Sequence, residues 1–203
     1  MTSSGFRKNC TIKCHNGKVE DTLQTTLKKS GLGITNKLIS SATIKGLALQ
    51  ENERMSKFEL PKHRVMSDAF KERGRDNVVM IDVFPVRDGE VLKVSFEGAV
   101  SSWRQGVWLK TDRGLLINNQ PCASAQIWYD TAPGEVLIQC RTENGCLHLY
   151  NIWDRGKGSD SQAWSSGMLV EEFPNGRRYR CNDIGFDSKF DKLVFRIERD
   201  PPR

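Results

Sequence analysis

The sequence has little of what marks common enzymes and membrane proteins. Only three of its 203 residues are histidine, His15, His63 and His148, and histidine is the side chain most often used in general acid–base catalysis. No apolar run approaches the ~20 residues that a membrane-spanning helix needs. The polar first residues, 1–9, are not followed by an apolar signal core. We therefore expect a cytoplasmic protein without a membrane partner.

Recognisable catalytic motifs are missing as well. The sequence contains no Gly-x-Ser-x-Gly, no Walker loop, no Gly-x-Gly-x-x-Gly and no His-Glu-x-x-His. Cys146 and His148 resemble a nucleophile and its base, but two residues along a strand separate side chains by about 7 Å, which is too far for a hydrogen bond. We expect a non-catalytic protein. A hydrolase using this pair, or the acids Asp183, Asp187 and Asp191, is the enzymatic alternative.

Charge and aromatic residues divide the chain unevenly. Residues 1–76 hold 15 Lys or Arg and 8 Asp or Glu, a net charge of +7, whereas residues 77–203 hold 16 and 17, a net charge of −1. All five Trp and all three Tyr lie after residue 100. Aromatic side chains supply much of the apolar surface of a core. We therefore predict a small basic N-terminal region, 1–76, and a main domain, 77–203, with the boundary at Lys71–Asn77.

Six cysteines occur in the chain. Their even number is compatible with disulfides, but a chain of this length without an export signal is expected to keep its thiols reduced. Cys10, Cys14 and the adjacent His15 resemble half of a structural zinc site, which needs four ligands. Because no second cysteine pair follows, we predict no bound metal and no cofactor.

Residues 77–203 consist of short apolar segments separated by turn residues. Ten segments have the length and composition of strands: Val78–Val83, Val91–Phe96, Gly106–Lys110, Leu115–Asn118, Ala125–Tyr129, Glu135–Arg141, Cys146–Ile152, Met168–Glu172, Arg178–Cys181 and Lys192–Glu198. No long helical periodicity interrupts them. This pattern predicts a mainly β fold, an antiparallel β-sandwich or jelly roll.

One turn signal in this domain is specific. Asn144-Gly145 supplies two residues that tolerate the positive φ of a type I′ turn, which predicts a hairpin that pairs Cys140 with Leu149. Strand alternation then directs four side chains toward the core: Ile138, Cys140, Leu147 and Leu149. In the last segment it directs inward Leu193, Phe195 and Ile197.

The N-terminal region is predicted to be a small α+β unit. A helix over about 19–29 ends at Gly31 and Gly33, and Thr35 is suited to cap a second short helix. Four lysines surround this turn: Lys28, Lys29, Lys37 and Lys45. Lysine contacts with phosphates give affinity with little sequence specificity. The expected partner of this region is a nucleic acid or an acidic protein.

The segment 151–166 is predicted to be the longest strand-free stretch of the domain. It carries Asp154 and Asp160 between Trp153 and Trp164. Two carboxylates are too few for a calcium loop, which needs six or more oxygen ligands. Aromatic rings beside a polar loop suit stacking on a sugar or a base. These four residues are candidate binding residues, and core packing of the two rings is the alternative.

Two arginines form a further candidate site. Arg178 and Arg180 alternate with Tyr179 and Cys181, so the two arginines share one face of a strand. Guanidinium groups bind phosphate and carboxylate in a bidentate manner. Arg178 and Arg180 are therefore either an anion clamp or cross-strand partners of acids such as Glu171.

Several segments resemble those of uncharacterised bacterial proteins: Gly106–Leu109, Leu149–Asp154, Ser166–Glu172 and Arg178–Asp183. The resemblance covers roughly residues 78–199. It implies a bacterial protein and implies no activity, site or partner.

These features together favour a non-catalytic binding protein. Its β domain would carry a ligand or partner surface, and its basic N-terminal region would engage an anionic partner. The sequence leaves three alternatives open: a carbohydrate-binding jelly roll, an immunity or inhibitor protein with one tight protein partner, and the hydrolase described above. It gives no prediction of the oligomeric state.

Overall fold

The computed structural model describes residues 13–15 and 60–200, with the backbone alone for the first of these segments. The expected N-terminal helices, the cluster of Lys28, Lys29, Lys37 and Lys45, and the zinc-like cysteine pair lie outside the described residues and side chains. The expectations for them stay predictions.

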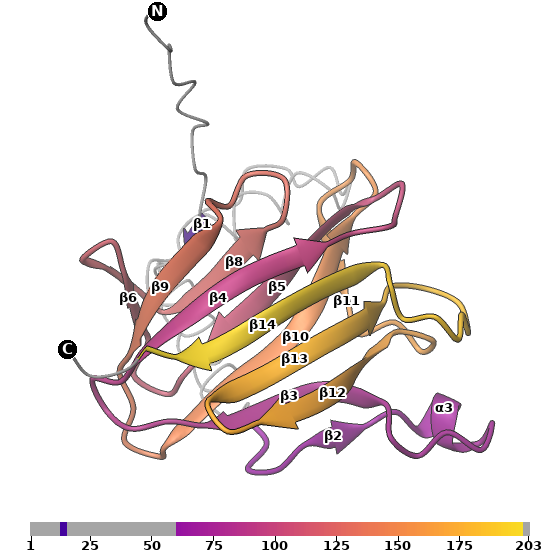
Figure 1. Cartoon of the computed structure of the whole chain (residues 1–203), viewed down its shortest axis with the longest axis horizontal. Coiled ribbons are helices and arrows are strands. Elements are labelled where there is room, and N and C mark those ends of the chain that lie inside the picture. The colour runs from indigo at the N-terminus through magenta and orange to yellow at the C-terminus, as the bar shows by residue number, and fades with distance from the viewer. Residues whose placement is uncertain (1–12, 16–59, 201–203) are drawn as a thin grey trace, which may run out of the picture. The chain divides into compact units, whose positions relative to one another are not determined.

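The described residues form a mainly antiparallel β fold, as predicted (Figure 1). Its elements are β1 (Lys13–His15), β2 (Val65–Met66), α3 (Asp68–Lys71), β3 (Val79–Pro85), β4 (Val91–Gly98), β5 (Arg104–Lys110), β6 (Leu115–Ile117), β7 (Gln120–Cys122), β8 (Ser124–Trp128), β9 (Glu135–Cys140), β10 (Cys146–Asp154), β11 (Ser159–Ser161), β12 (Gly167–Phe173), β13 (Gly176–Asn182) and β14 (Leu193–Arg199). All ten predicted segments are strands. The four additional strands, β1, β2, β7 and β11, are only two or three residues long.

The strands form one nearly closed, barrel-like sheet. Its path is β1-β8-β5-β10-β3-β12-β13-β14-β4-β9-β6-β7. Strand β3 joins the two halves of this path, since residues 82–85 pair with β10 and Val79 pairs with β12. Only Ala123 separates β7 from β8, so the chain passes directly from the last strand of the path to the second. The sandwich prediction is therefore refined to a single curved sheet.

The interior of the barrel follows strand alternation. The predicted inward residues of β9 and β10 have no exposed surface, and those of β14 are equally buried: Ile138, Cys140, Leu147, Leu149, Leu193, Phe195 and Ile197. They belong to one apolar cluster that draws side chains from both halves of the strand path. Full burial of such a side chain contributes roughly 1.5–3 kcal/mol, so this cluster is the main source of stability.

The hairpin predicted at Asn144-Gly145 is wrong. Strand β9 pairs with β4 and β6, whereas β10 pairs with β5, β3 and β11, so the turn connects strands in different parts of the barrel. Of the two turn residues, Gly145 has a positive φ, 73°, and Asn144 does not, whereas a type I′ turn requires a positive φ at both. The turn is instead held by Asp112, whose carboxylate accepts hydrogen bonds from the Thr142 hydroxyl and from the Glu143 and Asn144 amides.

The turn with two positive φ values lies elsewhere, between β6 and β7. Asn118 and Asn119 have φ values of 51° and 61°, and the flanking strands pair as a tight hairpin, with Ile117 opposite Gln120. Asparagine tolerates this region of φ better than other residues with a Cβ. The I′ geometry is therefore present in the domain, at an Asn-Asn sequence.

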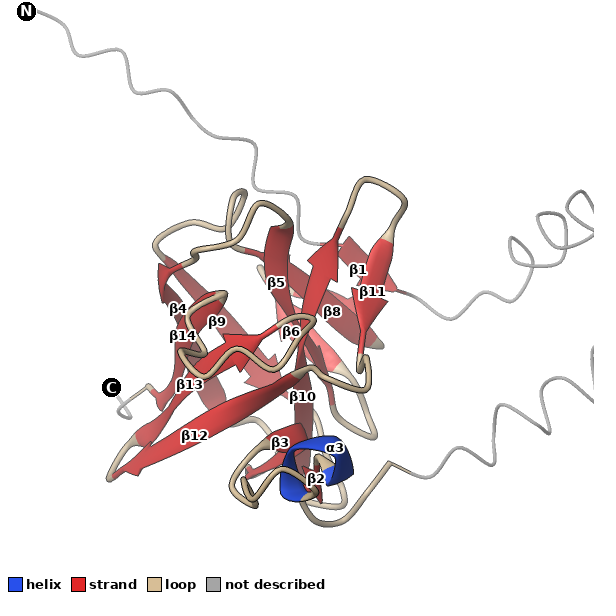
Figure 2. Ribbon diagram, turned by 90° about the vertical axis from the view of Figure 1, so that its right-hand side faces the viewer, coloured by secondary structure: helices blue, strands red, loops and turns tan. Residues whose placement is uncertain are grey.

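The β2–α3 segment belongs with the barrel. Strand β2 pairs with β3, and the Ser67 amide donates to the Val78 carbonyl over 2.8 Å. Figure 2 shows α3 beside β2 and β3. From α3, the ring of Phe70 packs on Phe190 with their centroids 5.4 Å apart. Residues of β2 and α3 thus contact β3 and the connection between β13 and β14.

The cysteines differ in state. Cys140, Cys146 and Cys181 carry free thiols, whereas Cys122 is disulfide-bonded, which departs from the expectation of reduced thiols throughout. In the described part of the chain, no helix has both the length and the apolar character needed to cross a membrane.

Candidate functional site

A buried carboxylate lies at one end of the barrel interior. Asp82 of β3 has no exposed surface. Its oxygens accept hydrogen bonds from Arg64 Nε at 2.5 Å, from Arg177 Nη1 at 3.0 Å and from the Tyr179 hydroxyl at 2.9 Å. Burying a charged carboxylate costs several kcal/mol unless partners replace its water. Three donors, two of them cationic, supply that replacement.

The same two arginines also meet an acid at the surface. Arg64 Nη2 lies 2.5 Å and Arg177 Nε 3.5 Å from a Glu172 carboxylate oxygen. Glu172 and Arg177 are directly opposed in the β12–β13 pair. The two guanidinium groups are therefore fixed from the interior by Asp82 and from the strand pair by Glu172. Their side chains keep 32% and 13% of their surface exposed.

The ring of Phe84 further restrains the arginines of this cluster. The guanidinium carbons of Arg177 and Arg199 lie 5.0 Å and 4.9 Å from the centroid of the Phe84 ring. Arg199 is itself held by Glu90 at 2.9 Å and by the Pro85 carbonyl at 2.8 Å. Cations over an aromatic face are attracted by its quadrupole. Arg177 is thus restrained by a ring, by two carboxylates and by the Val83 carbonyl.

The cluster opens into a cleft of about 400 Å³. Its lining residues are Lys62, His63, Arg64, Val83, Pro85, Gly145, Cys146, Glu172 and Arg177. The 61–64 segment is held on the barrel by a 2.8 Å contact between His148 Nε2 and the Pro61 carbonyl. Lys62, Arg64 and Arg177 thus line this cleft together with one exposed carboxylate, that of Glu172, which Arg64 and Arg177 contact. Ammonium and guanidinium groups in this arrangement suit a phosphate or a carboxylate ligand.

A second, larger cleft has mixed charge. It measures about 780 Å³ and is lined by Asp88, Arg113, Leu115, Leu116, Pro121, Cys122, Ala123, Arg141, Thr142 and Glu143. Arg113 and Glu143 form an ion pair with each other. Two acids, Asp88 and Glu143, thus balance two arginines in this cleft. Asp88 is also engaged in the turn after β9, where its carboxylate accepts a hydrogen bond from the Thr142 amide. The smaller cleft is the stronger candidate because its three cations, Lys62, Arg64 and Arg177, exceed Glu172 and the buried Asp82 by one charge, and because Asp82 fixes two of them.

The predicted site in 151–166 is not assembled. Trp153 is only 1% exposed, whereas Trp164 is 62% exposed. The stretch expected to lack strands contains the end of β10 and all of β11, which pair as a hairpin. Asp154 accepts hydrogen bonds from the amides of the three turn residues 156–158, and those bonds lower its pKa. Asp160 pairs with Arg155 at 2.8 Å.

The two carboxylates of this hairpin also lie on opposite faces. Asp154 is opposite Ser159, and Asp160 is opposite Trp153, the preceding residue of β10. Successive strand residues alternate in direction, so Asp154 and Asp160 do not share a cation. Within residues 60–200 no group of three metal-ligating side chains is found.

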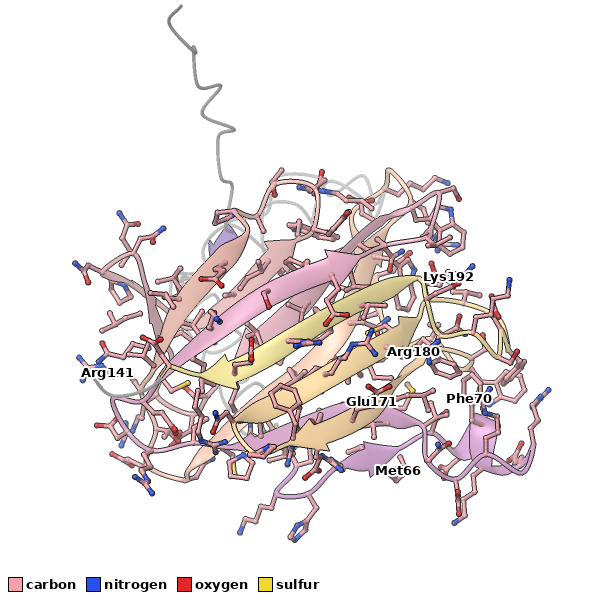
Figure 3. The ribbon with its side chains drawn as sticks, in the orientation of Figure 1. Met66, Phe70, Arg141, Glu171, Arg180 and Lys192 are labelled. Atoms are coloured by element: carbon pink, nitrogen blue, oxygen red, sulfur yellow. The ribbon has the colours of Figure 1, made fainter. Side chains whose placement is uncertain are left out.

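The predicted arginine pair shares an outward face, as expected, but its groups are already bonded. Arg178 forms ion pairs with Glu97 at 2.7 Å and Glu171 at 3.1 Å, and its hydrogen bond is the main cause of the lowered pKa of Glu97. Arg180 donates to the Lys189 carbonyl. Figure 3 shows Glu171 and Arg180 on this outer face. The cross-strand alternative therefore describes Arg178.

The residues of the hydrolase alternative have separate structural partners and do not form a catalytic pair. His148 is 1% exposed and uses Nε2 on the Pro61 carbonyl, while the Cys146 thiol lies 3.5 Å from the Asn144 carbonyl. Between described residues, no hydrogen bond joins Cys146 to His148. Asp183 is buried and accepts from Ser101 and Gln105, so it serves the packing of loops.

The Asp82 cluster was missed in the sequence, although one signal was present. Asp82 is the only charged residue in the run 78–86, where the other side chains are apolar, and a lone acid in such a strand requires a buried partner. Its partners, Arg64 and Arg177, are 18 and 95 residues away. Pattern analysis cannot supply pairs so distant.

Comparison with protein-family models, with curated proteins and with solved structures found no match.

Proposed function

We propose that this is a non-catalytic binding protein whose cleft at Lys62, Arg64 and Arg177 seats an acidic group of an anionic partner. The observation that carries the proposal is the pair of guanidinium groups fixed by the buried Asp82 beside a cleft of about 400 Å³. Fixed cations lose little side-chain entropy when a ligand binds.

The two arginines retain donors for a ligand. A guanidinium group has five N–H donors. Arg64 uses Nε and Nη2, and Arg177 uses Nε and Nη1, in their contacts with Asp82, Glu172 and the Val83 carbonyl. The remaining N–H groups, with the ammonium group of Lys62, are able to contact the oxygens of a phosphate or a carboxylate. Such charge-assisted bonds are stronger than neutral ones.

The charge of the chain supports a partner with more than one acidic group. Residues 1–76 have a net charge of +7, and Lys62 and Arg64 belong to this basic stretch. A polyanion that neutralises several of these cations releases counterions, so its affinity falls steeply with salt. Nucleic acid is the polyanion that we propose.

The proposal is tested with the full-length protein and a fluorescein-labelled single-stranded oligonucleotide in a salt series. Lys62→Gln and Arg64→Gln are expected to weaken binding and to reduce the slope of log affinity against log salt by about 1 each. Lys157→Gln, a charge change in the exposed β10–β11 turn, is the matched control and should leave both quantities unchanged. Equal affinities and slopes for the three variants would exclude the cleft as the site, and no binding at low salt would exclude a nucleic-acid partner.

A further inference from the structure

Aromatic rings and guanidinium groups gather where the loop after α3 meets the connections β11–β12 and β13–β14. The guanidinium carbon of Arg73 lies 3.6 Å from the Phe186 ring centroid and 5.0 Å from that of Trp164. That of Arg75 lies 4.8 Å from the Phe190 centroid. Phe70 of α3, which Figure 3 labels, also packs in this group, with its ring centroid 5.0 Å from that of Phe186. We call Arg73, Arg75, Trp164 and Phe186 the Trp164 platform.

The tryptophan of the platform is supported and yet exposed. Its ring meets the Phe186 ring edge-on, with centroids 5.2 Å apart and planes at 90°, while 62% of its surface is open to solvent. Beneath it, the buried residues Phe70, Val78 and Phe190 form a small apolar core, against which Phe186 packs. A large aromatic side chain held in place at the surface is characteristic of a recognition site.

The two arginines of the platform are unpaired with acids in the described part of the chain. Ion pairs occupy Arg64, Arg104, Arg113, Arg155, Arg177, Arg178, Arg196 and Arg199. Arg73 and Arg75 form none among the described residues; the Arg73 guanidinium donates one hydrogen bond, to the Ala69 carbonyl. Their flat faces rest on rings, which leaves N–H groups at the edges for an anion.

We infer that the Trp164 platform binds single-stranded nucleic acid, with a base stacked on Trp164 and neighbouring phosphates on Arg73 and Arg75. Exposed aromatic faces combined with cations are how barrels hold single strands without sequence preference. A sugar or an apolar peptide would use the ring but would leave both guanidinium edges without an anion. This inference rests on the proposed function insofar as the same polyanion would also reach the cleft.

The platform and the cleft lie at opposite ends of β12. Trp164 precedes Gly167, the first residue of this strand, and Glu172 near its end lines the cleft. Seven residues of strand span about 23 Å. Beside β3, the segment from Lys62 to Arg75 joins the two places, with Lys71 between them. A single strand of roughly the 4–16 nucleotides that an OB-type barrel binds is long enough to contact both.

The test uses the full-length protein with two labelled probes: a deoxythymidine 12-mer and an abasic oligomer of the same length. We expect the 12-mer to bind more tightly than the abasic oligomer. Trp164→Ala should weaken the 12-mer about 5- to 100-fold, leave abasic binding unchanged and keep the salt slope. Trp164→Phe should restore part of the affinity. Arg73→Gln should weaken both probes.

Trp103→Ala is the matched control. Trp103 is also partly exposed, and its ring centroid lies 5.6 Å from the guanidinium carbon of Arg155, but it belongs to a different loop. It should bind both probes as the unmodified protein does, and circular dichroism checks that each variant is folded. Equal binding of the two probes, or an unchanged 12-mer affinity in Trp164→Ala, overturns base stacking at the platform. The cleft is judged separately by the reduced salt slope of Lys62→Gln.

Discussion

The Tyr179 hydroxyl donates a 2.9 Å hydrogen bond to the Asp82 carboxylate across the interior of the barrel. The two residues belong to β13 and β3, which are not neighbours in the sheet, because β12 lies between them. This contact therefore ties together strands that the backbone ladder does not join. It also explains why a tyrosine, and not a phenylalanine, stacks on Phe195 at that position.

Removing this hydroxyl should be costly. Tyr179→Phe leaves a buried, charged acceptor with one donor fewer, and hydrogen bonds to charged groups contribute about 1.5–3 kcal/mol. We expect a loss of that size in the free energy of unfolding, measured in urea. Tyr129→Phe removes the same atom from a residue that is 42% exposed and should change stability by less than about 0.5 kcal/mol. Similar losses in both variants would contradict the role of the contact.

The charge of Asp82 should matter more than any surface ion pair. Asp82→Asn keeps the shape but leaves two part-buried guanidinium groups without their interior counter-charge, and breaking such a buried pair costs about 3–5 kcal/mol. The matched change Asp130→Asn disrupts an exposed pair with Arg104 and should cost at most about 1 kcal/mol. Chemical denaturation measures the free energy of unfolding of both variants, and equal losses would disprove the special role of the Asp82 charge.

A close approach between strands fixes Gly106. A Cβ at this position would lie 2.6 Å from the Ile127 carbonyl oxygen and 3.0 Å from the Trp128 ring. We therefore expect Gly106→Ala to destabilise the barrel by about 1–3 kcal/mol, as overpacking does. Gly98→Ala, also in a strand but with no atom within 4 Å of the added methyl group, should be neutral or slightly stabilising. Thermal unfolding of both variants provides the comparison.

Stability should fall in alkali. Burial raises the pKa of the Cys140 thiol from 9.0 to about 12, and it raises that of Cys181 as well. The folded protein then keeps protons that the unfolded chain releases, so this contribution is complete below pH 9 and is lost as the pH rises toward 12. Unfolding free energies between pH 7 and 11 should decline above pH 9, less steeply in Cys140→Ala. An identical slope in that variant would contradict the assignment.

The turn held by Asp112 should respond to acid. Partial burial opposes the charge of Asp112, but hydrogen bonds from Thr142 and from the Glu143 and Asn144 amides outweigh it and lower its pKa. The stabilisation is present above the ordinary aspartate pKa, about 4, and is lost as the pH falls through the folded-state value. Asp112→Asn should be less stable than the unmodified protein at pH 7, and the difference should shrink below pH 4. A constant difference from pH 7 to pH 3 would argue against this origin.

Much of the fold was accessible from local patterns. All ten predicted strands exist, because alternation and turn residues are properties of neighbouring positions, and the inward faces of β9, β10 and β14 follow from the same alternation. The partner of each strand was less accessible. The Asn144-Gly145 turn predicts a hairpin locally, but the long-range pairing of β9 with β4 and of β10 with β3 prevails.

The candidate site was harder still to predict. Trp164 was identified from composition and is exposed, whereas Trp153, identified in the same way, is buried. Trp153 lies in β10, which pairs with β5 and with β11, whereas Trp164 lies in the connection between β11 and β12. Their burial therefore depends on strand pairing that the local sequence does not specify. Asp82 and Arg177 meet only because β3 and β13 are folded around the same interior.

The position of β4 bears on how the molecule is made. One side of β4 pairs with β9, and the other pairs with β14, the last described strand. During synthesis, the donors and acceptors on that second side stay without their native partner until almost the whole domain has left the ribosome. An open strand edge in a nascent chain is a template for association with other chains. Closure of the barrel therefore has to wait until the last strand of the domain has been made, and the open edge of β4 is exposed to other chains until then.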